Sequence, residues 1–351
     1  MRTKLLFCTW LLALSPALAH DFEVVAEGQP LYFDIVNKTA KTVKVTYQGS
    51  IADNNPVKIK GVLTIPAKVK HDNVTYTVAA IGPKAFCNAT ELTGIVMPQG
   101  IESIGDFAFE GCTKLEKVVF PGNRTKIGQG AFFRCTSIKD VTIGSDWTTI
   151  DLAMFRWSHC LKTLTLPAKI EKVHNMKKLK GLTEVTVDPN NPHFSSHGGS
   201  LYNRDGSVLY GVPRNMQGKL KVHEGTRSIT AGAIGDCQMI TSIDLPSTVA
   251  EMPMRELSEL NGLETLIFRA NSPMTTGYLK GKKMLVLQVA NPQIQIVVPN
   301  GSKKAYLSML ATETGEYARE EKSGGIVYTI TTAQLPTEKN IKGVKSFTNY
   351  E

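Results

Sequence analysis

The sequence predicts a solenoid of short repeats, with a short parallel β-sheet on one face and turns and short helical segments on the other. Three observations predict this fold: a leucine-led pattern at nearly constant spacing, a second pattern that falls between its copies, and a cysteine content too low for a disulfide scaffold. Each repeat is too short to bury its own apolar residues. The copies must therefore stack into one continuous core.

The first nineteen residues have the order of a secretory signal peptide. Arg2 and Lys4 precede an apolar run at residues 5–14, and small residues end the segment at 17–19. This order predicts cleavage after Ala19. The run is shorter than the roughly 20 residues that a membrane-spanning helix needs, so we expect an exported mature chain without a transmembrane segment. Its location would be extracellular, at the cell surface or periplasmic.

The leucine-led pattern reads Leu-x-x-[Ile/Val/Leu]-x-apolar and is often followed by Pro. Its copies start at positions 92, 115, 138, 161, 182, 240 and 263. The first four starts are 23 residues apart, and so are the last two. The fourth and sixth residues of each copy are apolar, and this period of two predicts a short strand with one buried face. Stacked copies then pair these strands into a parallel sheet.

The second pattern, Ile-Gly-x-x-Ala-Phe, starts at positions 81, 104 and 127 and predicts the return side of each coil. Glycine suits a turn with unusual backbone angles, alanine permits close approach, and phenylalanine fills space between coils. A degenerate copy at Ile150 has Asp151 and Met154 in place of the glycine and the alanine.

Five cysteines follow the predicted cleavage site. Cys112, Cys135 and Cys237 occupy equivalent places, three residues before the next leading Leu or Ile, whereas Cys87 and Cys160 are two residues out of register. An odd number leaves at least one cysteine unpaired. We expect a ladder of small, buried, reduced thiols. A disulfide between neighbouring coils is the alternative, and a catalytic thiol is disfavoured.

These repeats resemble the BspA-type leucine-rich repeats of secreted and surface proteins of bacteria, over about residues 60–270. A further shared feature is VDPNNPHF from Val187 followed by GGSLYNRDGSVLYGVP from Gly198, which resembles the β-hairpin insertion of this family, at about 187–213. Local sequence also predicts the hairpin, because two apolar runs flank Asp205-Gly206, a strong turn signal. The resemblance implies a leucine-rich repeat solenoid that adheres to host matrix proteins, other cells or glycans.

The chain divides into five segments. They are a signal peptide at 1–19, a β-rich N-terminal cap at 20–80, the leucine-rich repeat array at 81–270, C-terminal repeats and a cap at 271–330, and a tail at 331–351. A cap is expected because an open solenoid exposes a raw apolar end. IQIVVPNGSKKAYLSML from Ile294 predicts a strand, a turn and a short helix from about Ser302. The tail shows little apolar periodicity, which indicates a mobile segment or an edge.

No pattern predicts catalysis, so we expect a non-enzyme without a cofactor. His193 and His197 have His-x-x-x-His spacing, but neighbouring Pro, Asn and Gly residues argue against the helix that would place both on one face. For these two histidines, an exposed loop is a simpler interpretation than a metal site. His159 next to Cys160 does not indicate a thiol–base pair, because neighbours in sequence usually point to different faces of a coil.

The formal net charge is +9, and removal of Arg2 and Lys4 reduces it to +7. The densest basic stretch holds lysines at positions 169, 172, 177, 178 and 180. A solvated face is its simplest explanation, and an anionic partner such as an acidic glycan or protein is the alternative. Nucleic acid is disfavoured by export and by the absence of interleaved basic and aromatic residues.

The candidate ligand-binding site is the outward face of the predicted sheet, which carries hydroxyls and a few charges of both signs along several coils. Its residues are Val96, Lys117, Val119, Asp140, Thr142, Thr163, Thr165, Glu184, Thr186, Ser242, Asp244 and Thr265. Gly94 and Ile267 hold two further outward positions. Such a face suits an extended protein or glycan partner, and the alternative is that it only keeps the sheet soluble.

The leading hypothesis is therefore a secreted or surface-exposed, adhesin-like binding module. A structural spacer or assembly component of the cell envelope is the first alternative. A glycan-active enzyme is the second, and it would require two carboxylates about 5 to 9.5 Å apart, a pair that one acid per coil does not predict. The sequence assigns no oligomeric state.

Overall fold

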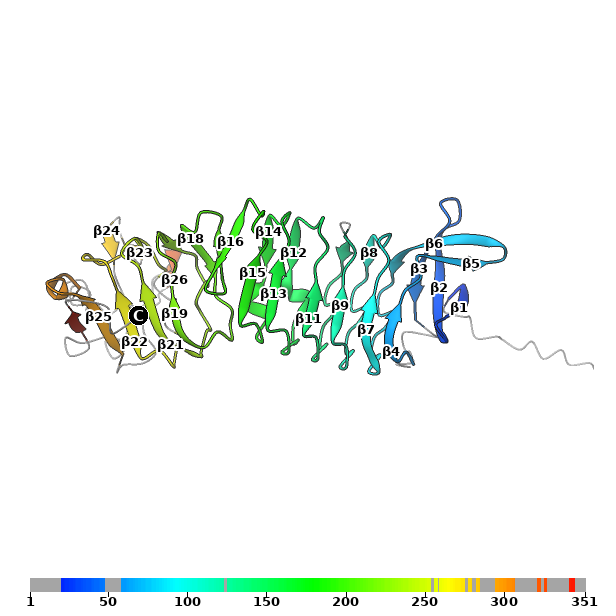
Figure 1. Ribbon diagram of the computed structural model, residues 1–351, viewed down its shortest axis with the longest axis horizontal. Coiled ribbons are helices and arrows are strands. Elements are labelled where there is room, and N and C mark those ends of the chain that lie inside the picture. The colour runs from blue at the N-terminus through cyan, green and yellow to red at the C-terminus, as the bar shows by residue number, and fades with distance from the viewer. Residues whose placement is uncertain are drawn as a thin grey trace, which may run out of the picture.

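The computed structural model describes residues 20–47, 58–122, 125–253, 256–257, 259–274, 277–279, 282–284, 294–306, 321–322, 325–326 and 341–344. Over these residues the chain forms a long stack of coils built almost wholly from short strands (Figure 1). The predicted signal peptide and most of the predicted tail lie outside the described residues. The predicted leucine-rich repeat solenoid, with its cap and its inserted hairpin, is confirmed.

The leucine-led strands form the parallel sheet that their spacing predicts. The strands of its first ladder are β4 (Gly61–Thr64), β7 (Leu92–Val96), β9 (Lys117–Val119) and β11 (Asp140–Thr142). Next comes the pair β13 (Thr163–Leu166) and β15 (Glu184–Val187), and then the ladder β19 (Gly218–Lys221), β21 (Ile240–Leu245), β22 (Thr265–Phe268), β25 (Gln295–Pro299) and β28 (Ile341–Val344). The leading residue of every predicted copy is at most 1% exposed, so each one packs into the core.

The return side is more regular than predicted, because it carries a second parallel ladder. The paired strands are β6 (Val74–Ile81), β8 (Ser103–Ile104) and β10 (Lys126–Ile127), then β12 (Thr149–Asp151) with β14 (Lys172–His174), then β18 (Val208–Gly211) with β20 (Ser228–Ile229). Helical structure on this side is limited, within the described part of the chain, to the 3₁₀ turns η2 (Leu152–Phe155) and η3 (Met176–Lys178).

The glycine of the Ile-Gly pattern serves close approach and not unusual backbone angles, so that part of the prediction is wrong. Neither Gly105 nor Gly128 has a positive φ, but a Cβ on Gly105 would lie 2.4 Å from the backbone nitrogen of Pro83. A Cβ on Gly128 would lie 2.5 Å from the backbone nitrogen of Asp106. Where Asp151 takes this place the coils cannot approach as closely. Among the described strands β12 pairs with β14 and not with β10, so the ladder is interrupted there.

Aromatic rings and thiols stack along the core in register with the coils. The rings of Phe86 and Phe109 are 5.1 Å apart between centroids, and those of Phe109 and Phe132 are 4.9 Å apart. The Sγ of Cys112 donates to the Phe86 carbonyl at 3.1 Å, and the Sγ of Cys135 donates to the Phe109 carbonyl at 3.0 Å. Cys112, Cys135 and Cys237 are buried and free, which confirms the predicted thiol ladder.

A thiol reagent should distinguish the buried cysteines from the exposed one. Burial raises the pKa of Cys237 to about 12 and raises that of Cys135 well above its usual range, so neither provides thiolate at neutral pH. We expect N-ethylmaleimide to modify Cys160, which is exposed, in the native protein, and to modify the buried three only after unfolding. Peptide mass spectrometry would locate the label. Native labelling of Cys135 as fast as that of Cys160 would contradict the stacked core.

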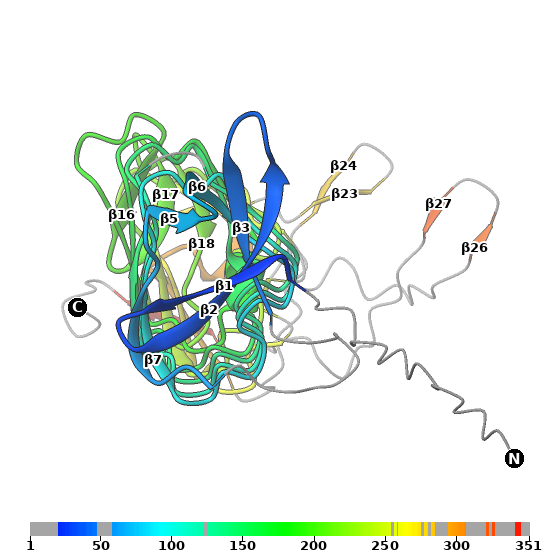
Figure 2. The same ribbon diagram turned by 90° about the vertical axis from the view of Figure 1, so that its right-hand side faces the viewer.

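The N-terminal segment forms a cap that continues into the return-side ladder. Strands β1 (Phe22–Ala26), β2 (Gln29–Asn37) and β3 (Thr42–Thr46) pair antiparallel, and β3 pairs in parallel with β6. β1 and β2 lie across the end of the coils (Figure 2). Their buried Leu31 and Phe33 belong to the same core as the coils, so the raw end of the solenoid is covered. β4 already belongs to the leucine-led sheet, although it lies within the segment predicted as cap.

The predicted hairpin is present and has a third strand. β17 (Ser200–Asn203) and β18 pair antiparallel around Asp205-Gly206, where Gly206 has φ 75°, and β16 (Phe194–His197) pairs antiparallel with β17. The buried side chain of Asn191 fastens this insertion to the preceding coil, since its amide donates to the Pro167 and Ile170 carbonyls at 2.9 Å. The loop interpretation is wrong for His197, which lies in β16, half-buried, with its ring stacked at 3.6 Å on that of His223.

The C-terminal coils close on a short helical segment at 303–306, close to the predicted start at Ser302. Tyr306 is buried there, and its hydroxyl donates to the Ala270 carbonyl at 3.0 Å. β28, within the predicted tail, pairs in parallel with β25 and extends the leucine-led sheet. The strand pairs β23 (Gly277–Leu279) with β24 (Lys282–Met284), and β26 (Glu321–Lys322) with β27 (Gly325–Ile326), project to one side of the coils (Figure 2).

Candidate functional site

The outward positions of the leucine-led sheet form two rows of side chains, one pair per coil. Strand register aligns Gly94, Lys117 and Asp140 in the first row, and Thr163 with Glu184 further along it. The second row aligns Val96, Val119 and Thr142, then Thr165 with Thr186. Neighbouring strands of a sheet are about 4.8 Å apart. The face therefore offers a contact to a partner at each such step.

Between residues 94 and 186 the side chains of these rows are mostly open to solvent. Lys117 Nζ lies 3.2 Å from Asp140 Oδ2, with the two side chains 60% and 53% exposed. The hydroxyls of Thr165 and Thr186 are 2.8 Å apart. Thr142, Thr163, Thr165, Glu184 and Val96 are also exposed, while Val119 and Thr186 are half-buried and Gly94 is buried. We call residues 94–186 of the two rows the open sheet face.

The C-terminal part of the same rows is not open. Ser242 and Thr265 are half-buried, and Asp244 is only 1% exposed, so the expected exposure of Asp244 is wrong. The physical reason is an ion pair across the sheet: Arg269 Nε and Nη2 donate to the Asp244 carboxylate at 2.8 and 2.9 Å, and Lys219 Nζ lies 3.5 Å from it. Ile267, in the same row, is also 1% exposed.

Hollows lie on the return side where its ladder is interrupted. Between β10 and β12, a hollow of about 440 Å³ is lined by residues that include Gly128, Gln129, Asp151 and Met154. It occurs at the degenerate copy of the second pattern, where an aspartate replaces the close-approach glycine. The missing glycine thus explains both the interruption and the space.

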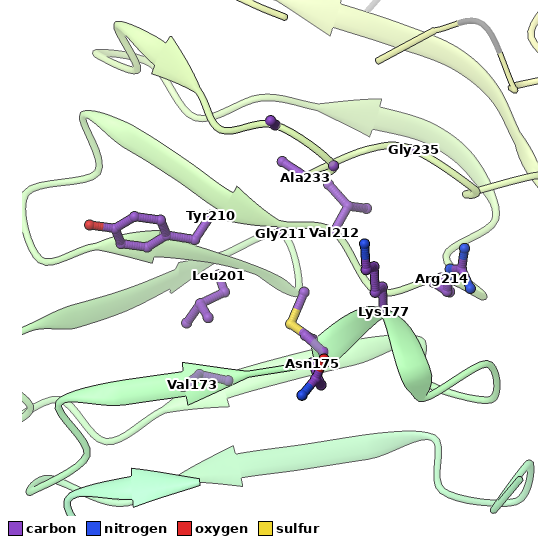
Figure 3. Close-up of a pocket in the computed structure, with 13 residues that line it drawn as sticks. Val173, Asn175, Lys177, Leu201, Tyr210, Gly211, Val212, Arg214, Ala233 and Gly235 are labelled. Carbon is purple, nitrogen blue, oxygen red and sulfur yellow. The ribbon is translucent and has the colours of Figure 1, made fainter. Parts of the chain in front are cut away.

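A second hollow lies between η3 and the β18 coil, and Figure 3 shows its lining. Its volume is about 200 Å³. Val173, Asn175 and Lys177 line one side, and the segments 210–212 and 231–235 contribute to the other. Lys177 extends from η3 toward Val212, with Arg214 beside it (Figure 3).

Next to this hollow is a smaller one, of about 110 Å³, that we call the basic pocket. Its lining consists of Arg156, Trp157, His159, Lys177, Lys178, Lys180 and Arg214. The basic pocket shares Lys177 and Arg214 with the larger hollow. Three lysines of the predicted basic stretch thus meet here, whereas Lys169 pairs with Asp146 at 2.5 Å.

Residues 68–193 match, in six copies, the family described as BspA type leucine rich repeat region. This part of the chain is a BspA-type repeat region. It spans the cap-to-coil junction, the open sheet face up to Thr186 and the Trp157 coil, so most of the geometry above belongs to BspA-type coils. No curated protein matches the chain.

Solved structures of similar proteins cover most of the chain at low identity. The pneumococcal vaccine antigen PcpA is 18% identical, covers 83% of this chain and 96% of its own, and has a TM-score of 0.46. A leucine rich cell surface protein from Faecalibacterium prausnitzii is 18% identical, with coverages of 80% and 89% and a TM-score of 0.40. A leucine-rich repeat protein from Eubacterium ventriosum is 17% identical, with both coverages at 80% and a TM-score of 0.48.

Beyond the BspA-type region, a buried carboxylate that the repeat pattern does not predict organises the next coil. Glu256 is 4% exposed. Its carboxylate accepts hydrogen bonds from the backbone N–H groups of Gly232, Ile234 and Gly235, the last two at 2.9 and 3.2 Å. These contacts join two coils 21 to 24 residues apart in sequence. Such a carboxylate has its acceptor capacity used by the backbone, so its role here is structural.

The described residues contain no group of three or more His, Cys, Asp or Glu side chains placed to hold a metal ion. Within the same residues, no helix has the length and apolar character needed to cross a membrane. The polar side chains that the coils bring together are aligned hydroxyls, paired charges and one aromatic ring among cations.

Proposed function

We propose that this protein is an adhesin-like binding module that recognises an extended protein or glycan partner through the open sheet face. The observation that carries the proposal is the double row of outward side chains, which offers charges and hydroxyls in fixed register on β7, β9 and β11 and again on the paired strands β13 and β15. A rigid row of this kind is formed before binding, so little conformational entropy is lost when a partner docks.

The chemistry of the rows fits a partner that supplies hydrogen-bond donors and acceptors at regular intervals. The threonine hydroxyls donate and accept, while Lys117 and Glu184 offer opposite charges at separate places along the face. A peptide strand or a glycan chain presents such groups along its length. The proposed role requires no catalysis and no cofactor.

The proposed location is outside the cytoplasm, either secreted or at the bacterial cell surface. The basic start, apolar run and small residues of 1–19 support it as a signal peptide. Proteins of the host matrix and glycans of host or bacterial cells are the partners such a location would provide. A spacer or assembly component of the envelope is the alternative role.

Replacement of Lys117, Asp140 and Glu184 by Ala should weaken binding to the partner at least tenfold while leaving the fold intact, because all three are exposed. The partner would be sought by applying residues 20–351 to arrays of matrix proteins and glycans at physiological salt. Calorimetry on the variant would then give the affinity, and circular dichroism would check the fold.

The matched control replaces Glu116, Lys139 and Glu171, which are equally exposed, carry the same charges and lie outside the two rows. It should bind as the unmodified protein does. Equal affinity of both triple variants would exclude the open sheet face, and the absence of any partner on the arrays would favour the spacer role.

A further inference from the structure

We infer that the basic pocket around Trp157 binds an anionic sugar residue, one that carries a carboxylate or a sulfate. This site lies on the coil edge and is separate from the open sheet face. The inference does not depend on binding at that face. Three observations support the inference: the position of the Trp157 ring, the unbalanced charge around this ring, and the larger hollow that adjoins the basic pocket.

Trp157 occupies a backbone position that normally takes a small or polar residue. Its φ is 74°, and the equivalent positions of preceding coils hold Asn88, Gly111 and Arg134, with φ between 59° and 72°. A bulky side chain is strained in this left-handed region. Trp157 is 41% exposed and is absent from the hydrophobic core, so packing does not offset that strain. The coil instead presents a flat aromatic surface to solvent.

The charge around this ring has one sign. Lys180 Nζ lies 5.5 Å from the Trp157 ring centroid and Arg156 Cζ lies 6.0 Å from it, while the His159 ring meets it edge-on at 5.8 Å. None of the seven lining residues is acidic. A cleft lined by cations concentrates anions and raises their rate of association.

The lysines of this pocket differ from three lysines on the turns and edges of the described coils that have an acidic partner. Lys114, Lys139 and Lys169 each pair with an acid contributed by a neighbouring coil. In the described part of the chain, Lys177 and Lys180 form no ion pair. An anionic ligand would supply the missing counter-charge. Arg214, whose Nη2 is paired with Asp236, adds a planar donor group whose Nε is buried without a hydrogen-bond partner among the described residues.

Size and lining favour a single sugar residue of a longer chain. The basic pocket, at about 110 Å³, is smaller than the roughly 300–1,000 Å³ of sites that enclose a whole drug-sized ligand. It continues past Lys177 and Arg214 into the 200 Å³ hollow lined by Asn175 and Tyr210 (Figure 3), where a second residue would fit. A uronate or a sulfated hexosamine combines an apolar ring face for Trp157 with an anionic group for the cations.

Other anionic polymers match the pocket less well. Sites for single-stranded nucleic acid stack successive bases on several aromatic rings along a groove. Here Trp157 is the one indole among the lining residues, with His159 placed edge-on to it. An acidic peptide would satisfy the lysines but has no ring face to cover the indole.

The test is titration of residues 20–351 with a sulfated uronate–hexosamine tetrasaccharide and with its desulfated, carboxyl-reduced form. Calorimetry would give the affinity. Tryptophan fluorescence would report the pocket, because Trp147, the other tryptophan of this segment, is buried. We expect saturable binding of the sulfated form that changes the Trp157 emission, and at least tenfold weaker binding of the neutral form.

Three variants make the test specific. Trp157→Asn keeps a residue type that the same position accepts at Asn88, so it should fold, yet bind at least tenfold more weakly. The double variant Lys177→Ala with Lys180→Ala should also fold and bind the tetrasaccharide at least tenfold more weakly. The matched control, Lys68→Ala with Lys70→Ala, removes two exposed charges from β5 and should stay within twofold of the unmodified affinity. The sheet-face triple variant should bind the tetrasaccharide normally.

Several results would overturn the inference: no saturable binding, unchanged affinity of Trp157→Asn, or an equal loss in the β5 control. An oligoglutamate or a single-stranded oligonucleotide that bound as tightly and with the same dependence on Trp157 would also overturn it, by assigning the pocket to a different polymer. If the open sheet face bound no partner, all of these readouts for the basic pocket would stay unchanged.

Discussion

Gly128→Ala is expected to lower the free energy of unfolding by about 3 kcal/mol, the upper range for an overpacked site. The added Cβ would lie 2.5 Å from the Asp106 backbone nitrogen and 2.6 Å from the Gly105 carbonyl carbon. Backbone cannot move aside as a side-chain end can, and each coil is held by its neighbours on both sides. The coils must therefore separate. Urea denaturation followed by far-ultraviolet circular dichroism would measure the change.

Gly100→Ala is the matched control, because its Cβ would meet nothing closer than 3.9 Å and the residue has no positive φ. Its effect should stay within about 0.5 kcal/mol. If both alanine variants unfolded at the same urea concentration, close approach of the coils could not be the reason for glycine in the Ile-Gly pattern.

The repeat spacing predicted the fold because stacking forces a periodic core onto a periodic sequence. Leu92 and Leu115 recur at the spacing of the coils, and both are fully buried. The return-side ladder was not predicted, since strands such as β8 and β10 have two residues each, too few to show a period. The effect of Asp151 on the return-side ladder could not be predicted from the sequence either, because it depends on how closely the coil that contains Gly128 approaches.

The candidate site was predictable in register but not in exposure. Alternation assigns Asp140 and Asp244 to the same face of the leucine-led sheet, and both lie on it. Arg269, a residue outside the repeat pattern, covers Asp244 and does not cover Asp140. The basic pocket was missed for a similar reason: Trp157 and Arg214 are far apart in sequence, and only the coil stacking brings them to one hollow.

Asp244→Ala should lower the free energy of unfolding by about 3 kcal/mol, a typical cost of removing one partner from a buried ion pair. Asp244 is 1% exposed and accepts two N–H groups of Arg269, whose side chain is itself only 18% exposed. The substitution removes a shared acceptor for Arg269 and Lys219 while both cations stay in a poorly solvated place. Urea denaturation would again give the magnitude.

Asp140→Ala is the natural comparison, because Asp140 makes the same kind of cross-strand contact on the same sheet face, to Lys117 at 3.2 Å, but in the open. Its effect should be below about 1 kcal/mol. Added salt should weaken the Lys117–Asp140 pair and leave the buried one nearly unchanged, since solvent ions screen exposed charges most. Equal and salt-sensitive effects at both aspartates would mean that Asp244 is open to solvent, and the face available to a partner would then extend to the C-terminal coils.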